Sequence, residues 1–141
     1  MANIIPDAFK SELLSGTHNF ANGGNTFKIA LFTDISGYST SSTAYSTTNE
    51  VSSSGTSYTA GGNALDSQAV SVASNTALVD FADEVFSSVT LSAVGAVIYN
   101  STNSDKLVVV LDFGGTKTAT NGDFTIQFPA AGASTAIIRI A

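Results

Sequence analysis

The stretch Val89–Phe128, VTLSAVGAVIYNSTNSDKLVVVLDFGGTKTATNGDFTIQF, decides the fold of this chain. β-Branched and aromatic residues recur along it, and its breaks consist of Asn, Gly, Ser and Asp, which is typical of strands joined by short turns. The first half predicts a hairpin in which Val89–Tyr99 pairs with Lys106–Phe113. The polar loop 100–105 joins these two strands.

The second half of this stretch predicts another hairpin, in which Thr116–Thr120 pairs with Asp123–Phe128. Asn121-Gly122 lies between them, and this dipeptide is the strongest short hairpin signal because both residues tolerate a positive φ. Leu107–Leu111 is apolar without alternation. We therefore expect it to form a central strand that is covered on both faces.

Further strands are predicted on both sides of this region. Thr26–Thr33 alternates, with Phe27, Ile29 and Leu31 on one face. A hairpin is expected around Ser74-Asn75, and Ser134–Ile140 closes the chain as a last strand. About eight strands with short turns indicate an all-β fold, an antiparallel β-sandwich or jelly-roll-like domain. The strands of the expected hairpin are Gln68–Val72 and Thr76–Phe81.

One short amphipathic helix is predicted before the strands, over residues 6–15. Ile5, Phe9 and Leu13 recur at helical spacing, and a proline suits the first helical turn because its missing N–H would have no partner there. Gly16 supplies the left-handed residue at which a helix ends.

Composition excludes several classes of protein. The chain has 141 residues, which fits a single domain, and 43% of them are hydrophobic, which excludes a disordered chain. It contains no Cys and one His, so no disulfide or thiolate metal site is expected, and no cofactor. The net charge of −6, with the five cations scattered singly, argues against nucleic acid. No segment predicts a membrane span or a secretory signal.

Residues 36–63 are unusually rich in Ser and Thr and contain Tyr38, Tyr45 and Tyr58. A compact domain seldom carries an empty loop of this length, so we expect an extended, ordered arm. Two roles are open for the rings. Tyr combined with Ser and Gly suits recognition of a partner, and the rings can equally fill the domain's own core.

Catalytic candidates are few. His18 is the only imidazole, and it follows the predicted helix, where a His often interacts with the helix end. Gly55–Thr59 misses the G-x-S-x-G pattern of hydrolases by its last residue, and the required strand and helix are not predicted around it. The sequence therefore gives no nucleophile with its base.

Carboxylates offer two further possibilities. Asp80, Asp83 and Glu84 follow a predicted strand, and they suit either a Ca²⁺ ion or an ordinary solvated turn. A glycan hydrolase on a β-sandwich needs two carboxylates facing each other across a cleft. The candidates for such a pair are Asp34, Glu50, Asp80, Asp83 and Asp112.

Five segments, taken in order, resemble a family of small structural proteins of tailed bacteriophages. They are Leu14–Phe20, Thr26–Phe32, Tyr58–Leu65, Gly95–Asn100 and Leu111–Gly115. The resemblance covers nearly the whole chain, but its motifs are turns and strands. It supplies no catalytic residues.

The resemblance implies a non-enzymatic virion protein, made in the host cytoplasm and placed on the capsid surface. We expect a decoration or cement protein that binds the major capsid protein and copies of itself as a cyclic oligomer such as a trimer. Contacts are expected through the arm, with Tyr38, Tyr45 and Tyr58, and through the N-terminal Ile4 and Ile5. The alternative is a tail or fibre module that touches the host surface.

Overall fold

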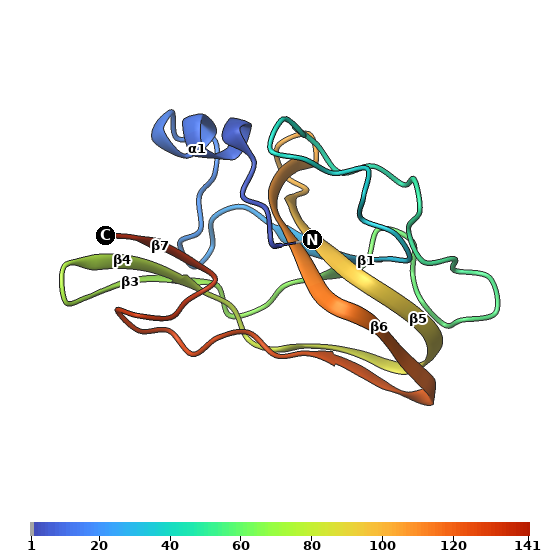
Figure 1. The fold of residues 1–141 in the computed structure, drawn as a ribbon. Coiled ribbons are helices and arrows are strands. Elements are labelled where there is room, and N and C mark those ends of the chain that lie inside the picture. The colour runs from blue at the N-terminus through green and yellow to red at the C-terminus, as the bar shows by residue number, and fades with distance from the viewer. Residues whose placement is uncertain (1) are drawn as a thin grey trace.

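The computed structural model describes residues 2–141 and is dominated by antiparallel β-structure (Figure 1). Two sheets form a sandwich-like arrangement, which confirms the predicted all-β class. One sheet has the order β2-β1-β5-β6 and the other β3-β4-β7. In chain order the elements are α1 (Asp7–Leu14), β1 (Phe27–Phe32), β2 (Asn63–Ala64), β3 (Ala69–Ala73), β4 (Thr76–Asp80), β5 (Glu84–Asn100), β6 (Lys106–Ile126) and β7 (Ile138–Ile140).

The predicted hairpin at Asn121-Gly122 is wrong, because β6 runs on through both residues and pairs with β5 on either side of them, in a ladder with several register shifts. Asn121 has a φ of +46°, and the ladder changes register on both sides of it. Its N–H donates to Thr90 Oγ1 at 3.0 Å. A positive φ suits a bulge as well as a turn. Here the long partner strand offers pairing on both sides, so the chain bulges and does not reverse.

The apolar run at the start of β6 is buried on both faces, as predicted, but β6 is an edge strand and not a central one. Other segments seal the first part of this edge. Ile4 N–H donates to Val110 O at 2.9 Å, and Val110 N–H returns a bond to Ile4 O at 2.8 Å. Leu107 N–H donates to Thr43 O at 3.0 Å. The N-terminal segment and the arm thus cover the first part of this edge, around Lys106–Asp112.

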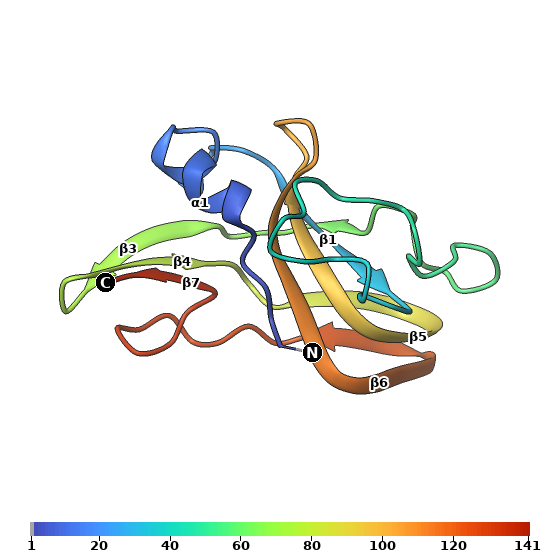
Figure 2. The same ribbon diagram turned by 45° about the horizontal axis from the view of Figure 1, so that its top comes forward.

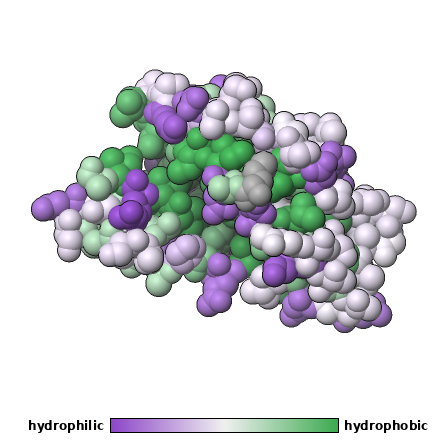
Figure 3. Space-filling view, in the orientation of Figure 1, coloured by the Kyte–Doolittle hydropathy of each residue, from purple (hydrophilic) through white to green (hydrophobic). Residues whose placement is uncertain are grey.

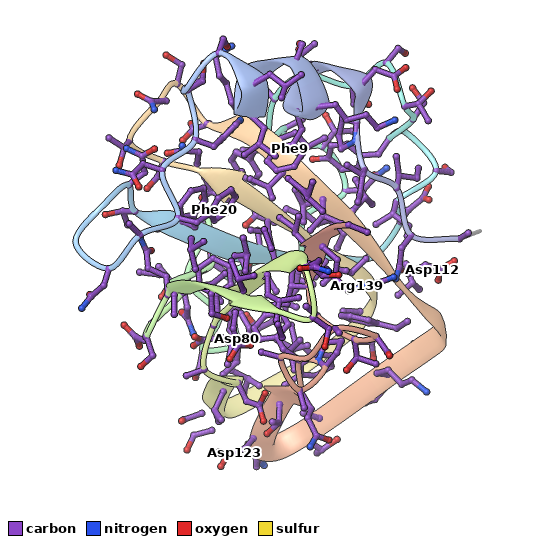
Figure 4. All side chains as sticks on the ribbon, turned by 90° about the vertical axis from the view of Figure 1, so that its left-hand side faces the viewer. Phe9, Phe20, Asp80, Asp112, Asp123 and Arg139 are labelled. Carbon is purple, nitrogen blue, oxygen red and sulfur yellow. The ribbon has the colours of Figure 1, made fainter. Side chains whose placement is uncertain are left out.

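Alternation in β1 divides the interior in two, as the sequence predicts. Phe27, Ile29 and Leu31 enter a larger core that lies between the helix and the two sheets. Ala30 and Phe32 enter a smaller core under the arm. In Figure 4 the labelled Phe9 and Phe20 lie between the helix and the sheets, within the larger core.

Helix α1 is one residue shorter at each end than predicted. Pro6 is its N-cap, with a ψ of 149°, and does not lie in the first turn. At the other end Gly16 adopts a φ of +80°. Gly16 N–H donates to Leu13 O at 3.3 Å and Thr17 N–H to Glu12 O at 2.9 Å. This is the Schellman arrangement, and it confirms glycine as the terminating residue.

The β3–β4 hairpin forms around Ser74 and Asn75, as predicted, with φ values of +47° and +64°. Two successive residues with positive φ make a type I′ turn, whose twist matches that of the strands. Strand β7 adds to the hairpin and is shorter than the predicted Ser134–Ile140. Figures 1 and 2 show this small sheet extending away from the arm, with the C-terminus beside it.

Candidate functional site

The arm at 36–63 is ordered by one carboxylate. Glu50 accepts hydrogen bonds from Tyr45 Oη at 2.5 Å, from Tyr58 Oη at 2.7 Å and from Gly61 N–H at 2.7 Å. Burial and the bond to Glu50 raise the pKa of both tyrosines, so both hydroxyls remain protonated donors at neutral pH.

The same network ties the arm to the large sheet. Tyr58 Oη also accepts the N–H of Leu31 in β1 at 3.0 Å. Tyr99 from β5 donates to Gly61 O at 2.6 Å, and its ring stacks on that of Tyr45 with centroids 4.3 Å apart. Burial and the nearby Asp105 carboxylate raise the pKa of Tyr99 to about 12.

The tyrosine rings therefore take the second of their two possible roles, packing within the chain itself. Tyr38 and Tyr58 are buried and Tyr45 is half-buried. Of the two N-terminal candidates, Ile4 is held by Val110, whereas Ile5 remains 39% exposed. A partner contact through these residues stays a prediction.

His18 lies at the centre of a second polar cluster, below the end of α1. Asn100 Nδ2 donates to His18 Nδ1 at 3.1 Å, and His18 Nε2 lies 2.7 Å from Glu12 Oε2. Because Nδ1 accepts, the proton of the neutral ring is on Nε2 and is donated to Glu12. Lys106 Nζ lies 3.3 Å from the other Glu12 oxygen. Both ring nitrogens are thus occupied by groups that are not nucleophiles.

This cluster predicts an acid-sensitive fold. Burial lowers the pKa of His18 from its ordinary value, although the bond to Glu12 opposes the shift. Below about pH 6.5 the unfolded chain binds a proton at His18 that the folded chain does not bind. The free energy of unfolding therefore decreases as the pH falls, by up to about 1.4 kcal/mol per pH unit. Denaturant unfolding of His18→Gln and wild type between pH 7.5 and pH 5, a window set by the ordinary His pKa, should show a shallower slope for the variant. Equal slopes would contradict the assignment.

The carboxylates named as calcium ligands are used separately. Asp83 Oδ1 accepts the N–H of Phe128 at 2.8 Å, and Glu84 Oε1 accepts Asn63 Nδ2 at 3.0 Å. Among residues 2–141 no three or more His, Cys, Asp or Glu side chains gather as a metal site. The Ca²⁺ alternative therefore gains no support, and the solvated-turn alternative fits Asp83, which is exposed, but not Glu84, which is buried at the start of β5.

Four of the five carboxylates named for a glycan hydrolase, all except Asp80, accept hydrogen bonds in local structure. Asp34 accepts the N–H of Ser36, and Asp112 accepts that of Gly114, each within a turn. Figure 4 shows Asp80 and Asp112 on different parts of the molecule. Glu50 already accepts from three donors in the arm. These contacts do not build two carboxylates that face each other across a cleft.

An apolar groove lies between the end of α1 and the face of the β3-β4-β7 sheet, with a volume of about 490 Å³. In Figure 3 hydrophobic side chains gather around a hollow in this part of the surface. No Asp, Glu, Lys or Arg lines it. The principal lining residues are Leu13, Phe20, Val70, Val79, Ile138 and Ile140.

The outer rim of this groove is exposed. Val70 is 54% exposed, Val72 73% and Ile140 53%. Register places them on one face, because Val70 lies opposite Val79 and Val72 opposite Ala77, which in turn lies opposite Ile140. Sequence reasoning predicted these strands but not this surface. The alternating valines of β3 were the available signal, and only the position of the strand shows that they face solvent.

A larger hollow, of about 610 Å³, lies between the second half of β6 and residues 127–137. It mixes apolar side chains such as Phe113 and Phe124 with charged ones. Its charged residues all belong to β6, so polar groups do not converge on it from several elements. The apolar groove is therefore the stronger candidate for binding.

Comparison with protein-family models, curated proteins and solved structures finds no match for this chain. In the described part of the chain no helix is long and apolar enough to cross a membrane.

Proposed function

We propose that this chain is a non-enzymatic structural protein of a tailed-phage particle, and that it decorates the capsid by binding the major capsid protein. The observation that carries the proposal is the apolar groove with its exposed rim. The family resemblance of the sequence supports the same conclusion. A decoration protein needs a compact β domain and a binding surface, and it needs no reactive side chains.

The polar residues support a structural role. His18 and Glu50 are committed to contacts that fix the helix and the arm. Within residues 2–141 no buried side-chain N or O atom lacks a hydrogen-bond partner. Catalytic sites commonly leave a polar group poised for substrate, and polar groups that are all satisfied internally fit a scaffold better.

The groove suits a protein surface as its occupant. Its lining is apolar except for His18 and Asn19, and its exposed rim comes from residues as large as Val and Ile. Exposed apolar groups that lie together mark interaction sites in soluble proteins. We assign the major capsid protein as the occupant, since a decoration protein contacts it in every copy.

A tail or fibre module is the second candidate, and copy number separates the two. A decoration protein is present in hundreds of copies per particle, whereas a tail protein is present in far fewer. The inward packing of the tyrosines favours the head over a host contact made by the arm. Quantitative mass spectrometry of purified particles of the encoding virus should find the higher number. Absence from the particle would refute both candidates.

The role of the rim can be tested by adding purified protein to particles made without it. Ile140→Lys places a charge at the groove, and we expect its binding to fall by about tenfold or more, since an unpaired charge would be desolvated in an apolar contact. Ser87→Lys, at an exposed position of β5 outside both the groove and the arm, is the matched control and should bind like wild type. Equal binding by the two variants would show that the groove does not contact the capsid.

A further inference from the structure

Strand β3 leaves one of its two sides unpaired. It forms a regular antiparallel ladder with β4, from Ala69↔Asp80 to Ala73↔Thr76, and it pairs with no other strand. Within residues 2–141 no backbone bond to another segment covers its outer side. This differs from the edge at β6, whose first part Ile4 and Thr43 seal. Strand β3 is thus an open edge, ready to pair with another strand.

The open edge lacks the features that usually prevent strand pairing. No charged residue occurs between Asp66 and Asp80, and β3 contains no proline. Its ladder with β4 shows no bulge. Natural proteins protect free edges with lysine, proline, bulges or a covering segment. Since none of these is present on β3, a partner strand is the remaining way to cover the edge.

The ladder determines which main-chain groups face outward. A two-residue turn is closed by a hydrogen-bonded pair, here Ala73 and Thr76, and such pairs alternate along an antiparallel ladder. Ser71 and Ala69 therefore direct their N–H and C=O groups toward β4. Val70 and Val72 direct theirs outward. The free edge presents two N–H donors and two C=O acceptors in regular spacing.

The sequence of β3, Ala69-Val70-Ser71-Val72-Ala73, reads the same in both directions. We propose that a second copy of this chain pairs with it antiparallel about a two-fold axis through Ser71, joining two three-stranded sheets into one of six strands. The inference does not depend on the proposed function, because it concerns the isolated protein.

The proposed register satisfies every outward group. Val70 faces Val72 of the partner subunit, and the two exchange both of their N–H···O bonds. The axis repeats this pair, so four bonds form, with Ser71 of each subunit meeting at the centre as a non-hydrogen-bonded pair. Valines lie opposite valines on one face, which extends the exposed rim of the groove across both subunits. Such an isologous contact closes as a dimer. The trimer expected from the resemblance would need a different contact.

Cysteine cross-linking tests both the contact and its register, because the natural chain has no Cys. In the proposed pair the two Ser71 Cα atoms are about 4.5 Å apart, which is within disulfide range. We expect Ser71→Cys to form a disulfide dimer readily under a mild oxidant. Ala69→Cys is the matched control. Its two copies lie about 14 Å apart in this register, so this variant should not form a disulfide under the same conditions. Faster cross-linking of Ala69→Cys than of Ser71→Cys would overturn the register.

Sedimentation of the 141-residue protein tests the dimer itself. Wild type should show a monomer–dimer equilibrium that depends on concentration. Val72→Pro removes one outward N–H without breaking a bond to β4, so it should sediment as a folded monomer with an unchanged circular dichroism spectrum. If that variant does not fold, Val70→Lys takes its place in the experiment. Its control is Leu14→Lys, because Leu14 lies away from the edge and is 90% exposed. A wild-type monomer at every concentration, or a trimer, would overturn the proposal.

Discussion

Gly62→Ala is expected to destabilise the protein severely, by more than about 4 kcal/mol. A Cβ at this position would overlap the carbonyl oxygen of Ile29 and lie 2.8 Å from Ala30 Cα. Both are backbone atoms of β1, so a side-chain rotation cannot relieve the contact. Gly62 also has a φ of +78°, which adds strain for any other residue. The arm would have to leave β1, and the pairing of β2 with β1 would be lost with it.

Gly55→Ala is the matched control for this prediction. Its φ of +72° is similar, but an added Cβ would meet no atom within 4 Å. We expect it to cost only the backbone strain, about 1 kcal/mol. Chemical denaturation of both variants and wild type measures the difference. Similar losses for the two variants would show that the close approach of Gly62 to Ile29 does not hold in solution.

Glu50→Ala is expected to cost about 3–5 kcal/mol, since it removes the acceptor of three donors at once. The hydroxyls of Tyr45 and Tyr58 and the N–H of Gly61 would lose their partner in a part-buried site. The loss should be accompanied by release of the arm, seen as faster proteolysis between residues 36 and 63. Thermal unfolding and limited proteolysis measure the two effects.

Two further variants serve as controls for the Glu50→Ala prediction. Glu50→Gln keeps an accepting oxygen and should lose less than half as much stability as Glu50→Ala. Asp66→Ala removes an exposed carboxylate and should change stability by less than about 0.5 kcal/mol. If Glu50→Ala behaved like Asp66→Ala, the carboxylate would not organise the arm.

The two predicted hairpins show what local sequence can and cannot predict about the path of the chain. Asn75, Asn121 and Gly122 are residue types that tolerate a positive φ, and in the structure Asn75 and Asn121 adopt it, whereas Gly122 does not; Ser74 adopts it as well. The first pair forms a turn and the second forms a bulge inside β6. The residue types therefore permit a turn at both places. Whether the chain then reverses depends on the length of the strand that lies alongside, and that strand is set by distant sequence.

The candidate surfaces show the same division. Tyr45 and Tyr58 were visible in the sequence, but their acceptor could not be chosen among eleven acidic residues. Val70 and Val72 were visible as part of a strand, yet an edge strand and a central strand can carry the same alternation. Neither the inward packing of the arm nor the exposure of the groove follows from pattern alone.

The sequence by itself determined the all-β class, the short helix ended by Gly16, the hairpin around Ser74-Asn75 and the alternation of side chains along β1. These depend on φ preferences and side-chain periodicity, which act over a few residues. The tertiary structure alone decided the bulge in β6, the role of Glu50 and the open edge at β3. Each of these depends on which segment lies beside another, and that neighbour is fixed by packing over the whole chain.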